Sequence, residues 1–66
     1  MQRLVQTHHF GPHRVDVVEL LDDDGVVGYT VLVDQETVSD ALLTSRPDLE
    51  EVVRMYAAWQ SRRGTD

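Results

Sequence analysis

Two apolar runs joined by an aspartate-rich turn constrain the fold of this chain more than any other feature. Residues 14–21 and residues 26–33 are rich in valine and other strand-forming residues, a composition typical of β-strands. Between them, residues 22–25 end in an Asp-Gly dipeptide, which tolerates the positive φ angles of a tight turn. The sequence therefore predicts an antiparallel hairpin over residues 14–33.

The pairing within this hairpin decides which side chains share a face of the sheet. A turn of residues 24–25 and a turn of residues 22–25 predict the same facing, because they differ by an even shift in register. Both predict one face with Val18, Leu20, Val27, Tyr29, Val31 and Val33, and an opposite face with Val15, Val17, Leu21, Val26 and Leu32. Since both faces are apolar, we expect both to be covered.

An amphipathic helix is predicted over about residues 46–63. Ser45 precedes Pro47 by two positions, a pattern typical of an N-cap serine with a proline in the first helical turn. Glutamates follow in the first turn and arginines end the segment, so the charges complement the helix dipole. We expect this helix to pack across the face that carries Val18 and Leu20.

The remaining segments complete the predicted sheet. Residues 2–8 are expected to form a first strand, and residues 37–42 form either a short fourth strand or one helical turn. The predicted fold is a single α+β domain over residues 1–66. It is a three- or four-stranded antiparallel β-meander followed by one C-terminal amphipathic helix packed on one sheet face. Its strands are expected at about residues 2–8, 13–21, 26–34 and 37–42.

The small size of the chain favours self-association. With 66 residues and no cysteine, it can form neither a disulfide nor a thiolate metal site, so its core needs other support. One helix covers only one face of the sheet. We therefore predict a homo-oligomer, with a dimer favoured, whose interface is the second apolar face together with a tryptophan at the edge of the helical stripe. The predicted interface residues are Val15, Val17, Leu21, Val26, Leu32 and Trp59.

The charge of the chain limits its partners. Six basic and twelve acidic residues give a formal net charge of −6, which opposes direct binding to nucleic acid or anionic lipid. No apolar run reaches the length of a membrane span, and residues 1–6 lack the apolar stretch of a signal peptide. We therefore expect no membrane partner and a cytoplasmic location. Lysine, isoleucine and asparagine are absent, which is typical of a high-GC bacterium.

Three histidines form the most conspicuous cluster that suggests ligand chemistry. His8, His9 and His13 surround a predicted turn and are weak candidates for a metal site, because adjacent positions of a strand point to opposite faces. The sequence has no nucleophile beside a histidine base, no glycine-rich phosphate loop and no zinc-protease helix motif. We therefore expect no catalytic residue, no cofactor and no enzymatic activity.

Three functions are compatible with these patterns. The favoured one is a small non-enzymatic, self-associating protein-interaction module. Residues 28–33, Gly-Tyr-Thr-Val-Leu-Val, loosely resemble the strand of HicB-like antitoxins, although no Pro-Gly-Cys-like turn follows them. The resemblance implies an alternative, an acidic regulatory partner, antitoxin-like or phage-encoded, that binds a basic site on another protein. The third is a His-dependent metal or small-ligand binding protein.

Overall fold

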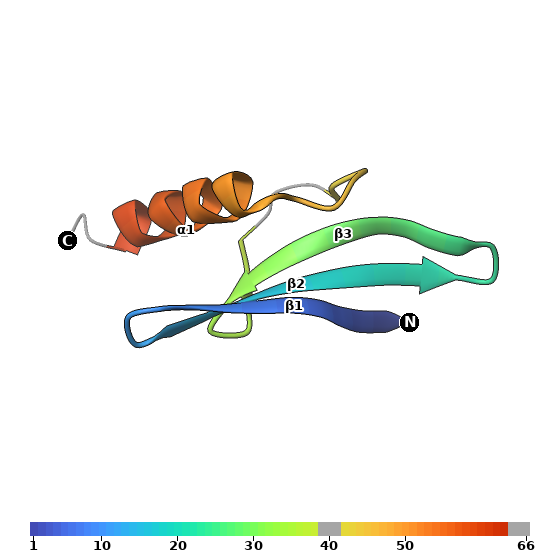
Figure 1. Cartoon of the computed structure of the whole chain (residues 1–66), viewed down its shortest axis with the longest axis horizontal. Helices are drawn as coiled ribbons and strands as arrows, with labels where there is room; N and C mark the ends of the chain where they lie inside the picture. Colours follow the sequence, from blue (N-terminus) through green and yellow to red (C-terminus); the bar gives the residue numbers. More distant parts are fainter. Residues whose placement is uncertain (39–41, 64–66) are drawn as a thin grey trace.

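A four-stranded antiparallel sheet and one C-terminal helix make up the fold (Figure 1). The computed structural model describes residues 1–38 and 42–63. The elements are β1 (Gln2–Phe10), β2 (His13–Asp22), β3 (Gly25–Val33), β4 (Glu36–Thr37) and α1 (Leu49–Arg63). The strands follow one another across the sheet in chain order, which confirms the predicted α+β fold with a β-meander.

The fourth strand is shorter than the predicted segment 37–42. β4 is two residues long, and Val38 adds one more backbone hydrogen bond to β3, at 2.9 Å. Residues 39–41 of the predicted segment lie outside the described residues. The chain meets β3 again at Leu43, whose backbone exchanges two hydrogen bonds of 2.9 and 2.8 Å with Tyr29. The outer edge of β3 is therefore paired in two separate places.

One extra residue in β3 decides which side chains of the hairpin share a face. Leu20 pairs with Gly28, but the next residue, Leu21, pairs with Val26. Val27 is therefore left without a cross-strand partner and forms a β-bulge. Because side chains alternate along a strand with a period of two, one extra residue reverses the facing of the two strands relative to each other.

The predicted facing of the hairpin is wrong because of this bulge. Both turn lengths suggested by the sequence assume regular pairing up to the turn, whereas the register shifts before it. Val15 and Val17 pair with Val33 and Val31, so these four valines share one face, and α1 packs on it. Val18, predicted to lie under the helix, alternates with Val17 and lies on the opposite face.

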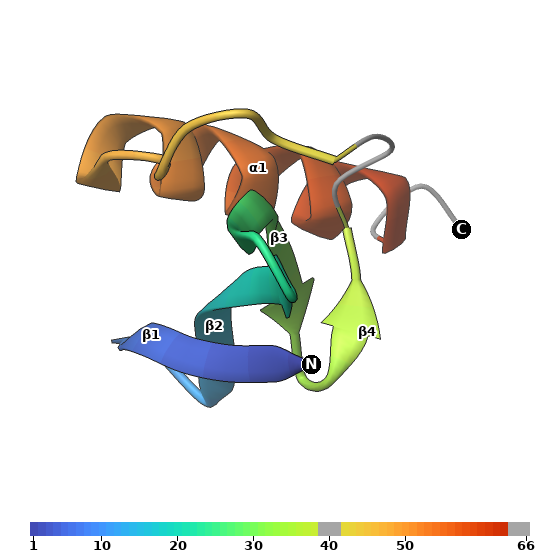
Figure 2. The same cartoon turned by 90° about the vertical axis from the view of Figure 1, so that its right-hand side faces the viewer.

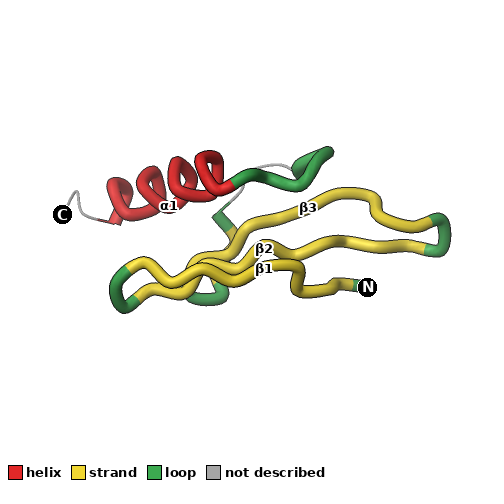
Figure 3. Tube along the Cα trace, in the orientation of Figure 1, coloured by secondary structure: helices red, strands yellow, loops and turns green. Residues whose placement is uncertain are grey.

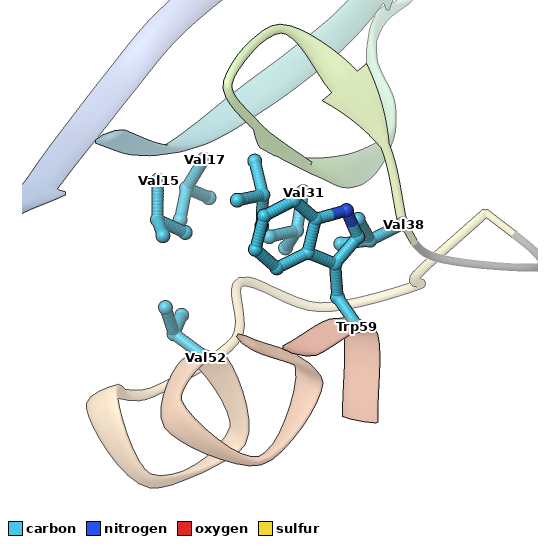
Figure 4. Close-up of a cluster of buried hydrophobic side chains, with 7 residues drawn as sticks. Val15, Val17, Val31, Val38, Val52 and Trp59 are labelled. Atoms are coloured by element: carbon cyan, nitrogen blue, oxygen red, sulfur yellow. The ribbon is translucent and has the colours of Figure 1, made fainter. Parts of the chain in front are cut away.

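The hydrophobic core lies between the valine face of the sheet and α1 (Figure 4). Its buried members are Val15, Val17, Val31, Val33, Val38, Val52 and Trp59. Trp59 is only 4% exposed, and its indole N–H donates to Glu36 Oε2 at 3.2 Å. Trp59, Val15 and Val17 therefore belong to the core of the chain, and their predicted place on an exposed interface is wrong.

The helix begins at Leu49, later than the predicted start at residue 46. Asp48 is the N-cap, because its Oδ1 accepts a hydrogen bond of 2.9 Å from the backbone N–H of Glu51. Ser45 is not the cap. Pro47 explains the shift, since a proline disfavours helical geometry at the residue before it and its own side chain is buried. The segment just before α1 is therefore not helical.

The helix covers only one side of the sheet (Figure 2). Its 15 residues span about 22 Å, whereas the molecule is 43 Å long. The turn between β2 and β3 extends beyond the helix at one end of the sheet, and the turn between β1 and β2 lies at the other end (Figure 3). Within residues 1–38 and 42–63, no helix is long and apolar enough to cross a membrane.

Candidate functional site

The sheet face opposite α1, called here the open face, is the strongest candidate for a functional surface. No helix of the described chain lies over it (Figure 2), and the Leu42 side chain packs against Gly28 at its β3 edge. Its aliphatic side chains are Leu4 from β1, Val18 and Leu20 from β2, and Leu32 from β3. Val18, Leu20 and Leu32 are half-buried by their neighbours within the sheet, and Leu4 is 52% exposed.

The register places these side chains next to one another. Leu4 pairs with Val18, and Val18 pairs with Thr30, so the three form one row across β1, β2 and β3. Leu20 lies two residues along β2 from Val18, and Leu32 lies two residues along β3 from Thr30, which makes them same-face neighbours of the row. The result is one continuous apolar patch instead of isolated exposed residues.

One carboxylate within the open face forms an ion pair. Asp16 is 8% exposed and lies opposite Leu32 in the register. Its Oδ1 accepts hydrogen bonds from Thr7 Oγ1 at 2.8 Å and from Arg14 Nε at 2.9 Å. Because Arg14 compensates the charge of Asp16, the middle of the open face is electrically neutral in a chain of net charge −6.

The structure divides the predicted interface residues between the two faces of the sheet. Leu32 lies on the open face, whereas Leu21 and Val26 pair with each other on the other side, near the β2–β3 turn. The sequence assigns Val18 and Leu20 to the face under the helix. In the structure they lie on the open face, where the sequence placed Val15 and Val17. Gly28 was the available signal, since a glycine inside a strand pattern often marks a bulge.

The three histidines do not converge on one point. His8 lies opposite Val15 on the helix side of the sheet, and its ring stacks on Phe10 at 6.1 Å between centroids. His9 is the next residue of β1 and therefore points to the other side. In the described part of the chain, no group of three His, Cys, Asp or Glu side chains is placed to hold a metal ion.

His13 belongs to a packed cluster at the end of the sheet. Its ring meets Trp59 edge-on at 5.0 Å and Tyr56 at 5.9 Å between centroids. Its Nδ1 lies 2.7 Å from Asp34 Oδ2. The contacts therefore join β2, the β3–β4 turn and α1, and they give His13 a role in holding the helix on the sheet.

The β3–β4 turn positions Asp34 for these contacts. Asp34 and Gln35 have φ angles of 51° and 71°, the geometry of a tight two-residue turn. The turn directs Asp34 Oδ1 to the backbone N–H of Arg14, which donates a hydrogen bond of 3.0 Å. This hydrogen bond, with the His13 side chain as second cause, holds the pKa of Asp34 below its ordinary value of 3.8.

No protein-family model matches the chain, and no curated protein or solved structure matches it either.

Proposed function

We propose that this chain is a small non-enzymatic protein-interaction module that self-associates through its open face. One observation carries the proposal. Leu4, Val18, Leu20 and Leu32 form a continuous apolar patch on a sheet face that α1 leaves uncovered. Apolar patches of this kind, bordered by polar residues, are typical of protein interaction sites.

Sheet packing and charge both favour a second copy as the occupant. Two sheets pack face to face about 10 Å apart when each offers a row of aliphatic and β-branched side chains, as the open face does. Two molecules of net charge −6 repel each other overall, so they need a neutral surface at which to meet. The Asp16–Arg14 pair leaves the middle of the open face neutral.

The test is the oligomeric state of the purified 66-residue chain. We expect analytical ultracentrifugation at micromolar concentration to show a dimer, and Leu32→Asp to convert it to a monomer with an unchanged far-ultraviolet circular dichroism spectrum. Leu4→Asp serves as a second variant. Leu4 is 52% exposed, so the monomer can accept a charged side chain at this position without unfolding. A buried charge in the interface would cost too much to be retained.

Val53→Asp is the matched control. Val53 is 44% exposed on α1, away from the open face, so the same change in side-chain character should leave the dimer intact. A wild-type chain that stays monomeric would overturn the proposal. So would a dimer that survives the Leu32 and Leu4 substitutions but dissociates with Val53→Asp.

A further inference from the structure

The open face is acidic at one end, whereas at the other end Arg14 and Asp16 compensate each other. Along β2, Arg14 and Asp22 stand at even-numbered positions like Val18, so all three belong to the open side. Arg14 lies at the end near the β1–β2 turn, and Asp22 begins the β2–β3 turn. Val18 is midway between them.

The end with the β2–β3 turn is strongly acidic. Asp22, Asp23 and Asp24 follow one another there, and all three are exposed. Their backbone and side chains form a local turn in which Asp22 Oδ1 accepts a hydrogen bond of 2.8 Å from the Asp24 N–H. The Met1 ammonium, bonded to the Leu21 carbonyl at 3.0 Å, offsets only one of the three negative charges.

Two symmetric arrangements with aligned strands can bury the open face against itself. In a dimer of this kind, a two-fold axis must lie between the two sheets and parallel to them. An axis along β2 keeps the strands of the two copies parallel and stacks each acidic turn on its counterpart. An axis across the strands makes them antiparallel and places the acidic turn of one copy over the Arg14 end of the other.

We propose that two copies dock in the antiparallel arrangement, with the two-fold axis crossing β2 at Val18. The inference depends on the proposed function and adds the geometry of the partner. Arg14 then faces the partner's Asp22, and the Arg14 of the partner subunit faces Asp22, so the contact is made twice. The assembly has four layers, with a helix on each outer side of two packed sheets.

The spacing of the charges supports this choice. Arg14 and Asp22 are eight residues apart, or about 26 Å along β2. The antiparallel arrangement therefore separates the two acidic turns by about 30 Å, well beyond the Debye length of about 8 Å at physiological salt. The parallel arrangement brings six aspartates together within that length, where like charges repel.

Cysteine cross-linking tests the geometry, since the chain has no cysteine of its own. Three single variants, Val18→Cys, Asp22→Cys and His9→Cys, are treated with a short bis-maleimide. His9 pairs with Arg14 in the register, and its substitution leaves the Arg14–Asp16 ion pair intact. We expect Val18→Cys to cross-link to itself. We also expect His9→Cys and Asp22→Cys to cross-link when the two variants are mixed, but not when each is alone.

The outcomes separate this inference from the proposed function. Strong self-cross-linking of Asp22→Cys would show the parallel arrangement and overturn the inference while leaving the self-associating module in place. A Val18→Cys dimer without any cross-link in the mixture would overturn it as well. If the wild-type chain is monomeric and Val18→Cys does not cross-link, both proposals fail.

An affinity measurement tests the charge pairing directly. Asp22→Asn should raise the dimer Kd by roughly fivefold, because symmetry removes two exposed contacts with Arg14 at once while the Arg14–Asp16 ion pair stays intact. Glu50→Gln is the control, since it also removes one negative charge and Glu50 pairs with Arg54 on α1, at 3.3 Å, away from the open face. A Kd that changes no more for Asp22→Asn than for Glu50→Gln would overturn the electrostatic basis of the arrangement.

Discussion

Substituting alanine at two adjacent valines of β2 tests which face of the sheet the helix covers. Val17 is fully buried against α1, whereas Val18 is half-buried on the open face. Val17→Ala removes two buried methyl groups, each worth about 0.8 kcal/mol, and adds the cost of the cavity, so we expect a loss of about 2 to 3 kcal/mol. Val18→Ala should lower the stability of the monomer by less than about 1 kcal/mol.

Urea unfolding followed by circular dichroism, at several protein concentrations, measures both effects. A domain of 66 residues has a total stability of about 3 to 10 kcal/mol, so the loss at Val17 should move the unfolding midpoint clearly. The Val17→Ala loss should not depend on concentration, whereas Val18→Ala should weaken the dimer and act mainly at high concentration. A larger loss for Val18→Ala than for Val17→Ala under dissociating conditions would refute the facing derived from the Val27 bulge.

Two further predictions concern the turn and the helix start. The pKa of Asp34 is lowered by the Arg14 N–H and by His13, so its carboxylate stabilises the fold above about pH 4, and that contribution is lost as the pH falls through the folded-state pKa. Asp34→Asn should therefore be less stable than wild type at pH 7 and lose this difference on acidification, as measured by thermal unfolding across pH; a constant difference would contradict it. Asp48→Ala should cost about 1 kcal/mol and Ser45→Ala almost nothing, measured by urea unfolding, whereas the reverse order would mean that Ser45 is the cap.

The start of the helix shows how two good local signals compete. Ser45 and Asp48 are both strong N-cap residues, and both stand close to Pro47. In the folded chain Pro47 is buried, and Asp48 accepts the hydrogen bond from Glu51. The position of the cap therefore follows from how the segment before α1 packs on the sheet, which residue preferences do not contain.

The kind of candidate surface and one of its residues can be predicted from the sequence. An uncovered apolar face follows from an apolar hairpin accompanied by one helix, and Leu32 was placed on that face. Val15 and Val17 were assigned to it as well, but the structure buries both. Val18 takes their place on the surface. A buried valine and a surface valine of one strand differ only in which way they point.

The sequence alone determined the strands, the Asp-Gly turn and the helix, because these depend on residue preferences and periodicities within a few positions of the chain. Only the tertiary structure decided which face of the hairpin meets the helix. Side chains alternate along a strand with a period of two, so the single extra residue Val27 is enough to exchange the faces. With Val27 bulged, Val17 and Val31 pair on the face under α1, and those contacts exist only in the folded chain.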